Sequence, residues 1–161
     1  PMRDERGFFA RTFYREEFER HGLEPLVAQC SVSHNERRGT LRGLHYQAAP
    51  REEPKLVRCT RGEIWDVIVD LRPGSATRLQ WFGCELTEAN HRALYVPQGF
   101  AHGFQTLAEH SEVLYQMGER YYADLARGVR WDDPEIGIRW PLAESVISPR
   151  DRALPLVRDL R

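Results

Sequence analysis

One segment decides the fold: Ile64–Leu71, with the sequence IWDVIVDL. It is rich in β-branched residues, and turn signals bound it on both sides, Arg61-Gly62 before it and Arg72-Pro73-Gly74 after it. A short apolar run between such turns is typical of a strand in the interior of a sheet. The segment therefore predicts a β-strand, and the neighbouring runs decide what kind of sheet it joins.

Further short runs of β-forming residues lie on both sides of this segment, separated by turns such as Thr87-Glu88-Ala89-Asn90. Because no helical pattern alternates with them, we expect a mainly β protein, an antiparallel sandwich or barrel. The predicted strands are Leu56–Thr60, Ile64–Leu71, Gln80–Leu86, Arg92–Val96, Gly103–Leu107 and Glu112–Met117.

Only one segment predicts a helix. Tyr14–Arg20 (YREEFER) is charged around a single phenylalanine, and Gly22 provides a C-terminal cap. After Asp124 the chain becomes rich in tryptophan and proline, which predicts peripheral loops and a short strand covering the barrel. With no repeat or linker in its 161 residues, the chain is expected to form a single domain over 1–161.

The composition is that of a folded protein and indicates no charged partner. Apolar residues make up 41% of the chain, more than a disordered protein carries. The 23 Lys and Arg residues balance 24 Asp and Glu residues, so neither nucleic acid nor an acidic membrane is expected as a partner. No apolar run approaches the roughly 18 residues that cross a bilayer.

The cysteines and the first residues indicate the cytoplasm. Cys30, Cys59 and Cys84 are widely spaced and odd in number, so reduced thiols are the simplest account. The start, PMRDERGFF, has acidic residues where a signal peptide has a basic and then an apolar run. Secretion is therefore not expected.

A histidine in Gly39–Gln47 (GTLRGLHYQ) is the first candidate for chemistry. Alternation from Leu41 places Leu41, Gly43, His45 and Gln47 on one face of a strand, and Arg42, Leu44 and Tyr46 on the other. With glycines near it, His45 could be a base at the bottom of a pocket. It could equally be a hydrogen-bonded core histidine, and this stretch leaves both interpretations open.

A second histidine, His102, lies in Pro97-Gln98-Gly99-Phe100-Ala101-His102. This P-x-G-x-x-H pattern resembles the second motif of the cupin superfamily, in which the histidine often binds a metal. Cupin metal sites usually add an H-x-H pair, whereas here His45 is followed by Gln47. Glu52 and Glu53 lie downstream, but without a third histidine the ligand set is incomplete, so no metal is expected.

Seven blocks, in order and over nearly the whole chain, together resemble the dTDP-4-dehydrorhamnose 3,5-epimerase family. One such block would be weak evidence; their joint order is strong. The blocks are Arg42–Gln47, Lys55–Cys59, Gly62–Arg72, Pro97–Phe104, Tyr115-Gln116, Trp131–Pro134 and Ser148-x-x-Asp151.

The resemblance implies a cupin-type jelly roll, a homodimer, no metal or cofactor, and a nucleotide-diphosphate-linked 4-keto-6-deoxy sugar as substrate. His45 matches the catalytic base and Asp151 its carboxylate partner. Lys55 matches the cation near the keto oxygen, and Tyr115 the proton donor on the opposite face. The implied substrate-binding residues are Arg6, Arg11, Gln29, Ser31, Arg42, Gln47, His102 and Arg150, with Arg6 and Gln29 at the diphosphate and Arg42 and His102 at the sugar.

The chemistry of these residue types agrees with the implied roles. A proton α to a ketone can be removed only if the enolate oxygen is stabilised, which a cation such as Lys55 provides. Inversion needs an acid on the other face of the ring, so base and acid must be different groups. An aspartate bonded to His45 would fix its tautomer. Because the ketone itself is the electron sink, no cofactor is required.

Three positions depart from the family pattern, all in the expected nucleotide subsite. Arg11 and Ala126 stand where the family has glutamates, and Ser31 where it has an asparagine. Exchanging a carboxylate for a guanidinium reverses the hydrogen-bonding requirement at that spot. The identity of the nucleotide, thymidine, cytidine or guanosine diphosphate, is therefore left open, as is inversion at C3, C5 or both.

Other functions fit the same fold. A nucleotide-sugar 3,4-ketoisomerase would move the ketone instead of inverting a centre. A metal-dependent cupin such as a dioxygenase, or a sugar-binding cupin without activity, would use the same scaffold in other ways.

Overall fold

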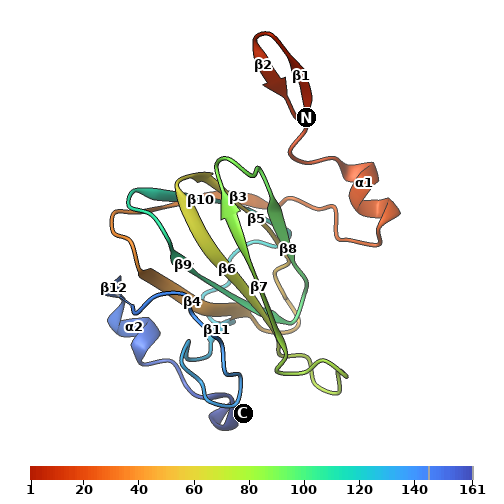
Figure 1. Ribbon diagram of the computed structural model, residues 1–161. Helices are drawn as coiled ribbons and strands as arrows, with labels where there is room; N and C mark the ends of the chain where they lie inside the picture. Colours follow the sequence, from red (N-terminus) through yellow and green to blue (C-terminus); the bar gives the residue numbers. More distant parts are fainter. Residues whose placement is uncertain (145, 161) are drawn as a thin grey trace.

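Two β-sheets facing each other form the body of the protein in a computed structural model that describes residues 1–144 and 146–160 (Figure 1). One sheet has the order β3 (Gln29–Asn35), β10 (Ser111–Met117), β5 (Lys55–Arg61), β8 (Ala93–Val96). The other has the order β11 (Ala126–Gly128), β4 (Thr40–Gln47), β9 (Phe100–Thr106), β6 (Glu63–Asp70), β7 (Trp81–Thr87). The short β12 (Val146–Ile147) adds to β4 in parallel, whereas the other pairings are antiparallel.

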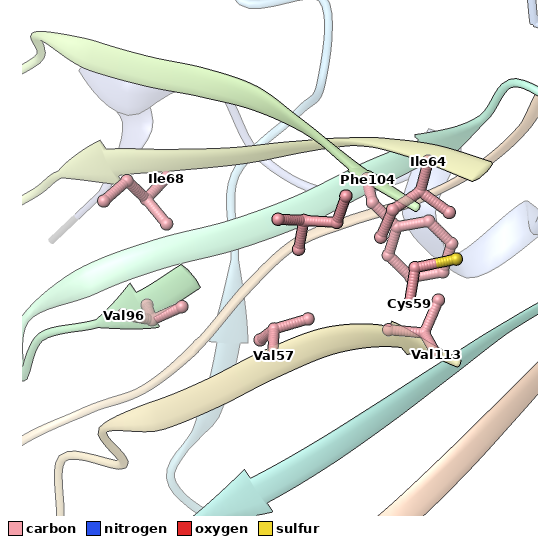
Figure 2. Close-up of a cluster of buried hydrophobic side chains, with 8 residues drawn as sticks. Val57, Cys59, Ile64, Ile68, Val96, Phe104 and Val113 are labelled. Atoms are coloured by element: carbon pink, nitrogen blue, oxygen red, sulfur yellow. The ribbon is translucent and has the colours of Figure 1, made fainter. Parts of the chain in front are cut away.

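The strand β6 is buried on both faces, which explains its nearly continuous apolar sequence. Ile64 and Ile68 point toward the other sheet and pack in the cluster between the sheets with Val57 of β5 and Phe104 of β9 (Figure 2). The alternate residues, such as Val67, pack on the outer face of the larger sheet against side chains of the C-terminal segments. The expected C-terminal cover of the barrel is thus confirmed.

All six predicted strands are present, and most of their ends differ from the prediction by one residue. β9 begins three residues earlier than predicted, at Phe100, because residues from Phe100 onward already pair with β6. The predicted helix is α1 (Arg15–Arg20). Gly22 follows it at φ 66°, and the Leu23 amide donates to the Phe18 carbonyl at 2.9 Å, which is the expected glycine-ended cap.

Short elements near the two ends were not predicted. The C-terminal region contains α2 (Pro149–Arg152) and a 3-10 turn, η1 (Val157–Asp159). Near the N-terminus, β1 (Met2–Asp4) and β2 (Gly7–Phe9) form a hairpin that projects away from the sheets (Figure 1). No helix in the described part of the chain is long and apolar enough to cross a membrane.

The strand that carries His45 departs from regular alternation. β4 and β9 shift register by one residue between Arg42 and His45, which is a β-bulge. Gly43 lies at φ 118°, and a Cβ there would come within 2.7 Å of the Gly103 Cα atom, so the site requires glycine. The predicted faces are therefore wrong before the bulge: Arg42, not Leu41, shares the inter-sheet face with His45.

Candidate active site

A cavity of about 370 Å³ opens at one end of the sandwich, where β4 and β10 end and β3 and β5 begin. These strand ends come from both sheets, so the cavity lies at the mouth of the space between them. Six of the predicted site residues line it: Gln29, Ser31, His45, Lys55, Gln47 and Arg150.

His45 forms a hydrogen-bonded pair with Asp151. The His45 Nε2 atom lies 2.7 Å from Asp151 Oδ1, and the Gly43 amide donates to Asp151 Oδ2 at 3.2 Å. The Asp151 side chain is only 6% exposed, whereas that of His45 is 40% exposed. The aspartate is therefore held in the wall, and the imidazole faces the cavity.

The position of Asp151 depends on contacts far apart in the sequence. Ser148 caps α2 by accepting a hydrogen bond from the Asp151 amide at 3.0 Å, and Pro149 occupies the first turn. Just before it, β12 pairs with Thr40 and Leu41 of β4. α2 is thus fixed beside the strand that carries His45.

The environment of Asp151 keeps it ionised. Burial alone would raise the pKa of this carboxyl, but the hydrogen bond and charge of His45, together with the bonds to Gly43 and Ser148, lower the pKa below its ordinary value. An ionised carboxylate at this distance accepts a hydrogen bond from a ring N–H group of the imidazole. It therefore directs the Nε2–H of His45 toward Asp151 and leaves Nδ1 as the free ring nitrogen.

Lys55 is buried at the cavity wall and forms an ion pair. Its Nζ atom lies 3.2 Å from Glu53 Oε1, and the two side chains are 10% and 7% exposed. Burying an ammonium group requires such a partner. The sequence pattern predicts no ion pair for Glu53, although alternation places it two residues before Lys55 on the same side of an extended chain, a signal that identifies the pair.

Tyr115 projects from β10 between the sheets, on the face that also carries the core residue Val113. Burial raises the pKa of its phenol, and the nearby charge of Asp66 raises it further. Arg42 and a hydrogen bond with Ser33 oppose this rise. Tyr115 is therefore a neutral phenol that holds its proton. It comes from the sheet opposite the one that carries His45.

A second histidine–carboxylate pair lies next to the first. His102 is directly opposite His45 in the register of β9 and β4, and its Nε2 atom lies 2.7 Å from Asp66 Oδ1. This pair is almost completely buried, with side chains 5% and 0% exposed. The second oxygen of Asp66 has no hydrogen-bond partner among the residues that the structure describes. Asp66 was missed in the sequence, although an acid inside an apolar strand signals a buried partner.

The guanidinium of Arg42 is hydrogen-bonded to residues of β3. Its Nε atom donates to Asn35 Oδ1 at 2.7 Å, and Nη2 donates to the His34 carbonyl at 3.4 Å. Asn35 is buried and also donates to the Ser111 carbonyl, so it fixes the guanidinium rigidly. Arg42 shares the inter-sheet face with His45, but it does not line the cavity.

Three predicted substrate-binding residues, Gln47, Arg6 and Arg11, have no side-chain group that is free and directed into the cavity of this chain. Gln47 lines the cavity, but its amide bonds to the backbone of Arg51, Arg120 and Tyr122, so it braces the wall. Arg6 lies in the projecting hairpin, paired with Asp4, and Arg11 stacks over Tyr14. Neither arginine lines the cavity of its own chain.

The histidines at the cavity and directly behind it are not arranged as metal ligands. His45 and His102 each direct Nε2 to a carboxylate, and the position of the second cupin histidine is Gln47, whose amide is already engaged. Within 1–144 and 146–160, the one convergent group of three His, Cys, Asp or Glu side chains lies elsewhere, at His34, Glu36 and His110.

The chain is similar in sequence to proteins of known family. A family model described as dTDP-4-dehydrorhamnose 3,5-epimerase matches residues 1–159. The protein of that name from Methanothermobacter thermautotrophicus is 47% identical over 154 residues, covering 92% of this chain and 81% of the relative.

Solved structures of the same kind superpose closely. The Bacillus anthracis dTDP-4-dehydrorhamnose 3,5-epimerase, with TDP and PPi bound, has a TM-score of 0.91 at 46% identity, over 95% of this chain and 87% of the other. A 3,5-epimerase from Legionella pneumophila in complex with dTDP-4-keto-L-rhamnose also has a TM-score of 0.91, at 38% identity over 98% and 84%. The expected cupin-type jelly roll is confirmed, and the chain belongs to the dTDP-4-dehydrorhamnose 3,5-epimerase family.

Proposed function

We propose that this protein is a cofactor-independent epimerase that inverts C3, C5 or both in a nucleotide-diphosphate-linked 4-keto-6-deoxy sugar. The observation that carries the proposal is the His45–Asp151 pair facing a cavity that also contains the buried cation Lys55. Membership of the epimerase family supports it independently.

His45 removes the proton. Because Nε2 is bonded to Asp151, the lone pair that accepts the substrate proton is on Nδ1. The ionised Asp151 stabilises the imidazolium that forms, without itself taking the proton. Positioned general bases of this kind accelerate proton transfer by roughly 10²–10⁴-fold.

Lys55 and Tyr115 complete the reaction. The ammonium of Lys55 stabilises the negative charge that develops on the C4 oxygen, and its burial strengthens this interaction. Tyr115 then returns a proton to the carbon from the opposite face. The origin of His45 and Tyr115 in opposite sheets supports this arrangement, since inversion needs base and acid on opposite sides of the ring.

Solvent deuterium exchange tests the assignment. With the 4-keto substrate in D₂O, the wild-type enzyme should incorporate deuterium at the inverted centre. His45→Asn should abolish exchange, because no base remains. Tyr115→Phe should retain exchange but lose net inversion. Exchange at the wild-type rate in His45→Asn would refute the proposed base, and movement of the ketone to C3 would identify a ketoisomerase instead.

We further propose dTDP as the nucleotide. The bound TDP and dTDP-sugar of the related crystal structures support it. Ser31 and Ala126, both at the cavity wall, are two of the positions where the residues expected near the nucleotide differ from the family pattern. Calorimetric titration with dTDP, CDP and GDP decides the question. Binding of CDP or GDP as tight as that of dTDP would contradict the proposal.

A cytoplasmic homodimer is the proposed form of the enzyme. The hairpin β1–β2 carries exposed Met2 and Phe9, 70% and 65% accessible, and an isolated hairpin is marginally stable in water. Pairing with a second copy would cover it and bring Arg6 to the partner's cavity. Light scattering gives the oligomeric state. Mixing inactive Arg6→Ala and His45→Asn chains should restore activity if the sites are shared.

A further inference from the structure

Three potential metal ligands converge at the end of β3 and β10 that is remote from the cavity. His34 is in β3, Glu36 follows that strand, and His110 lies just before β10. The His34 Nε2 atom is 3.4 Å from Glu36 Oε1, and His110 Nδ1 is 3.0 Å from Glu36 Oε2. The candidate ligand atoms of all three residues lie within 4.8 Å of one another.

The backbone already holds these side chains together. His110 adopts a left-handed conformation, φ 52°, and its amide donates to the Glu36 carbonyl at 3.2 Å. The buried Asn35 side chain donates to the Ser111 carbonyl at 3.1 Å, and these two residues are partners in the strand register. The segment that follows β3 at Glu36 and the segment that precedes β10 at His110 are therefore fixed relative to each other. The two imidazole rings lie nearly parallel, with centroids 6.1 Å apart.

We propose that His34, Glu36 and His110 form a surface site for a first-row transition-metal dication, with Zn²⁺ as the reference ion. Two imidazoles and one carboxylate suit Zn²⁺, Ni²⁺ or Cu²⁺, whereas Mg²⁺ and Ca²⁺ prefer sites made of oxygen atoms. Metal–nitrogen bonds are roughly 2.0–2.1 Å, so the ligands must close slightly around the ion. Exposed side chains, 41%, 71% and 55% accessible, are free to do so.

The site adjoins the segment that positions Arg42. Asn35, between His34 and Glu36, accepts the hydrogen bond from Arg42 Nε, and the His34 carbonyl accepts from Nη2. An ion bound by His34 and Glu36, the two neighbours of Asn35 in the chain, restrains this segment in its observed conformation. Since the ion binds the folded chain, it raises the melting temperature by mass action.

Calorimetric titration of the untagged protein with ZnCl₂ tests the site. The wild-type protein should bind one ion per chain, and MgCl₂ should give no binding heat. His34→Ala, Glu36→Gln and His110→Ala should each weaken zinc binding by at least about tenfold. These exposed substitutions should leave the circular dichroism spectrum unchanged. Unchanged affinity in His110→Ala, or the same heat with MgCl₂, would overturn the proposal.

Matched variants exclude the other candidate ligands. His21 pairs with Glu17 at 3.1 Å but has no third ligand in the described structure, so His21→Ala should bind zinc as tightly as wild type. Glu112 faces His34 in register but accepts a hydrogen bond from the Thr60 hydroxyl, so Glu112→Gln should also bind normally.

Two outcomes would place the ion elsewhere. Loss of binding in His45→Asn would place the ion at the active site. Co²⁺ showing thiolate charge-transfer absorption would place it at the exposed Cys30. Either result would refute the site.

Discussion

The two histidine–aspartate pairs have the same bond length and opposite surroundings. His45 and His102 face each other across β4 and β9, and each Nε2 lies 2.7 Å from a carboxylate oxygen. The His45 side chain is 40% exposed to the cavity, whereas that of His102 is 5% exposed. The second oxygen of Asp151 accepts a hydrogen bond from the Gly43 amide, but that of Asp66 has no partner within 1–144 and 146–160.

This comparison separates a chemical role from a structural one. A general base needs a ring nitrogen that a substrate can reach, and of the two residues His45 is the one that lines the cavity. A buried carboxylate needs its partner for stability, and among the described residues His102 is the hydrogen-bond partner of the Asp66 side chain. The same pair of residue types is therefore open to a substrate on β4, where we propose proton transfer, and enclosed on β9, where its loss should mainly cost stability.

The largest effect is expected when the exposed pair is broken. His45→Asn removes the base while the Gly43 amide still donates to Asp151, so activity should fall by about 10³-fold, roughly 4 kcal/mol of barrier. The free energy of unfolding should change by no more than about 1 kcal/mol, since the ring is partly solvated. Steady-state kinetics and urea unfolding measure both. Strong destabilisation would remove the distinction between the pairs.

Breaking the buried pair by the same substitution should mainly affect stability. His102→Asn leaves the Asp66 carboxylate buried without its partner, which should lower the free energy of unfolding by about 3 kcal/mol in urea. Adding Asp66→Asn removes the charge, so the double variant should be less destabilised than the sum of the single variants. Additive losses would show that the pair is not energetically coupled.

The smallest effect concerns acid stability. Because the pKa of Asp151 is lowered in the folded state, the unfolded chain binds more protons there below about pH 4, and the stabilisation is lost as pH falls through the folded pKa. It is fully present above that range. Thermal unfolding followed from pH 6 to 3 should therefore show a shallower acid decline for Asp151→Asn than for wild type. Parallel curves would contradict the lowered pKa.

Local patterns predicted the strands well, because β-branched runs between turns need no knowledge of distant residues. The segment Ile64–Leu71 was found to within one residue, as β6 (Glu63–Asp70). The β-bulge at Gly43 was not predictable by alternation, since it depends on the close approach of Gly103 from another strand. For this reason the faces assigned to Leu41 and Arg42 were wrong.

The sequence by itself determined the β class, the strand positions and, through the resemblance of its ordered blocks, the family. It also named His45, Lys55, Tyr115 and Asp151 together. Only the tertiary structure decided which nitrogen of His45 is free, that Glu53 neutralises Lys55, and that His102 is enclosed with Asp66. These features depend on burial and on contacts between residues up to 106 positions apart, which local sequence does not encode.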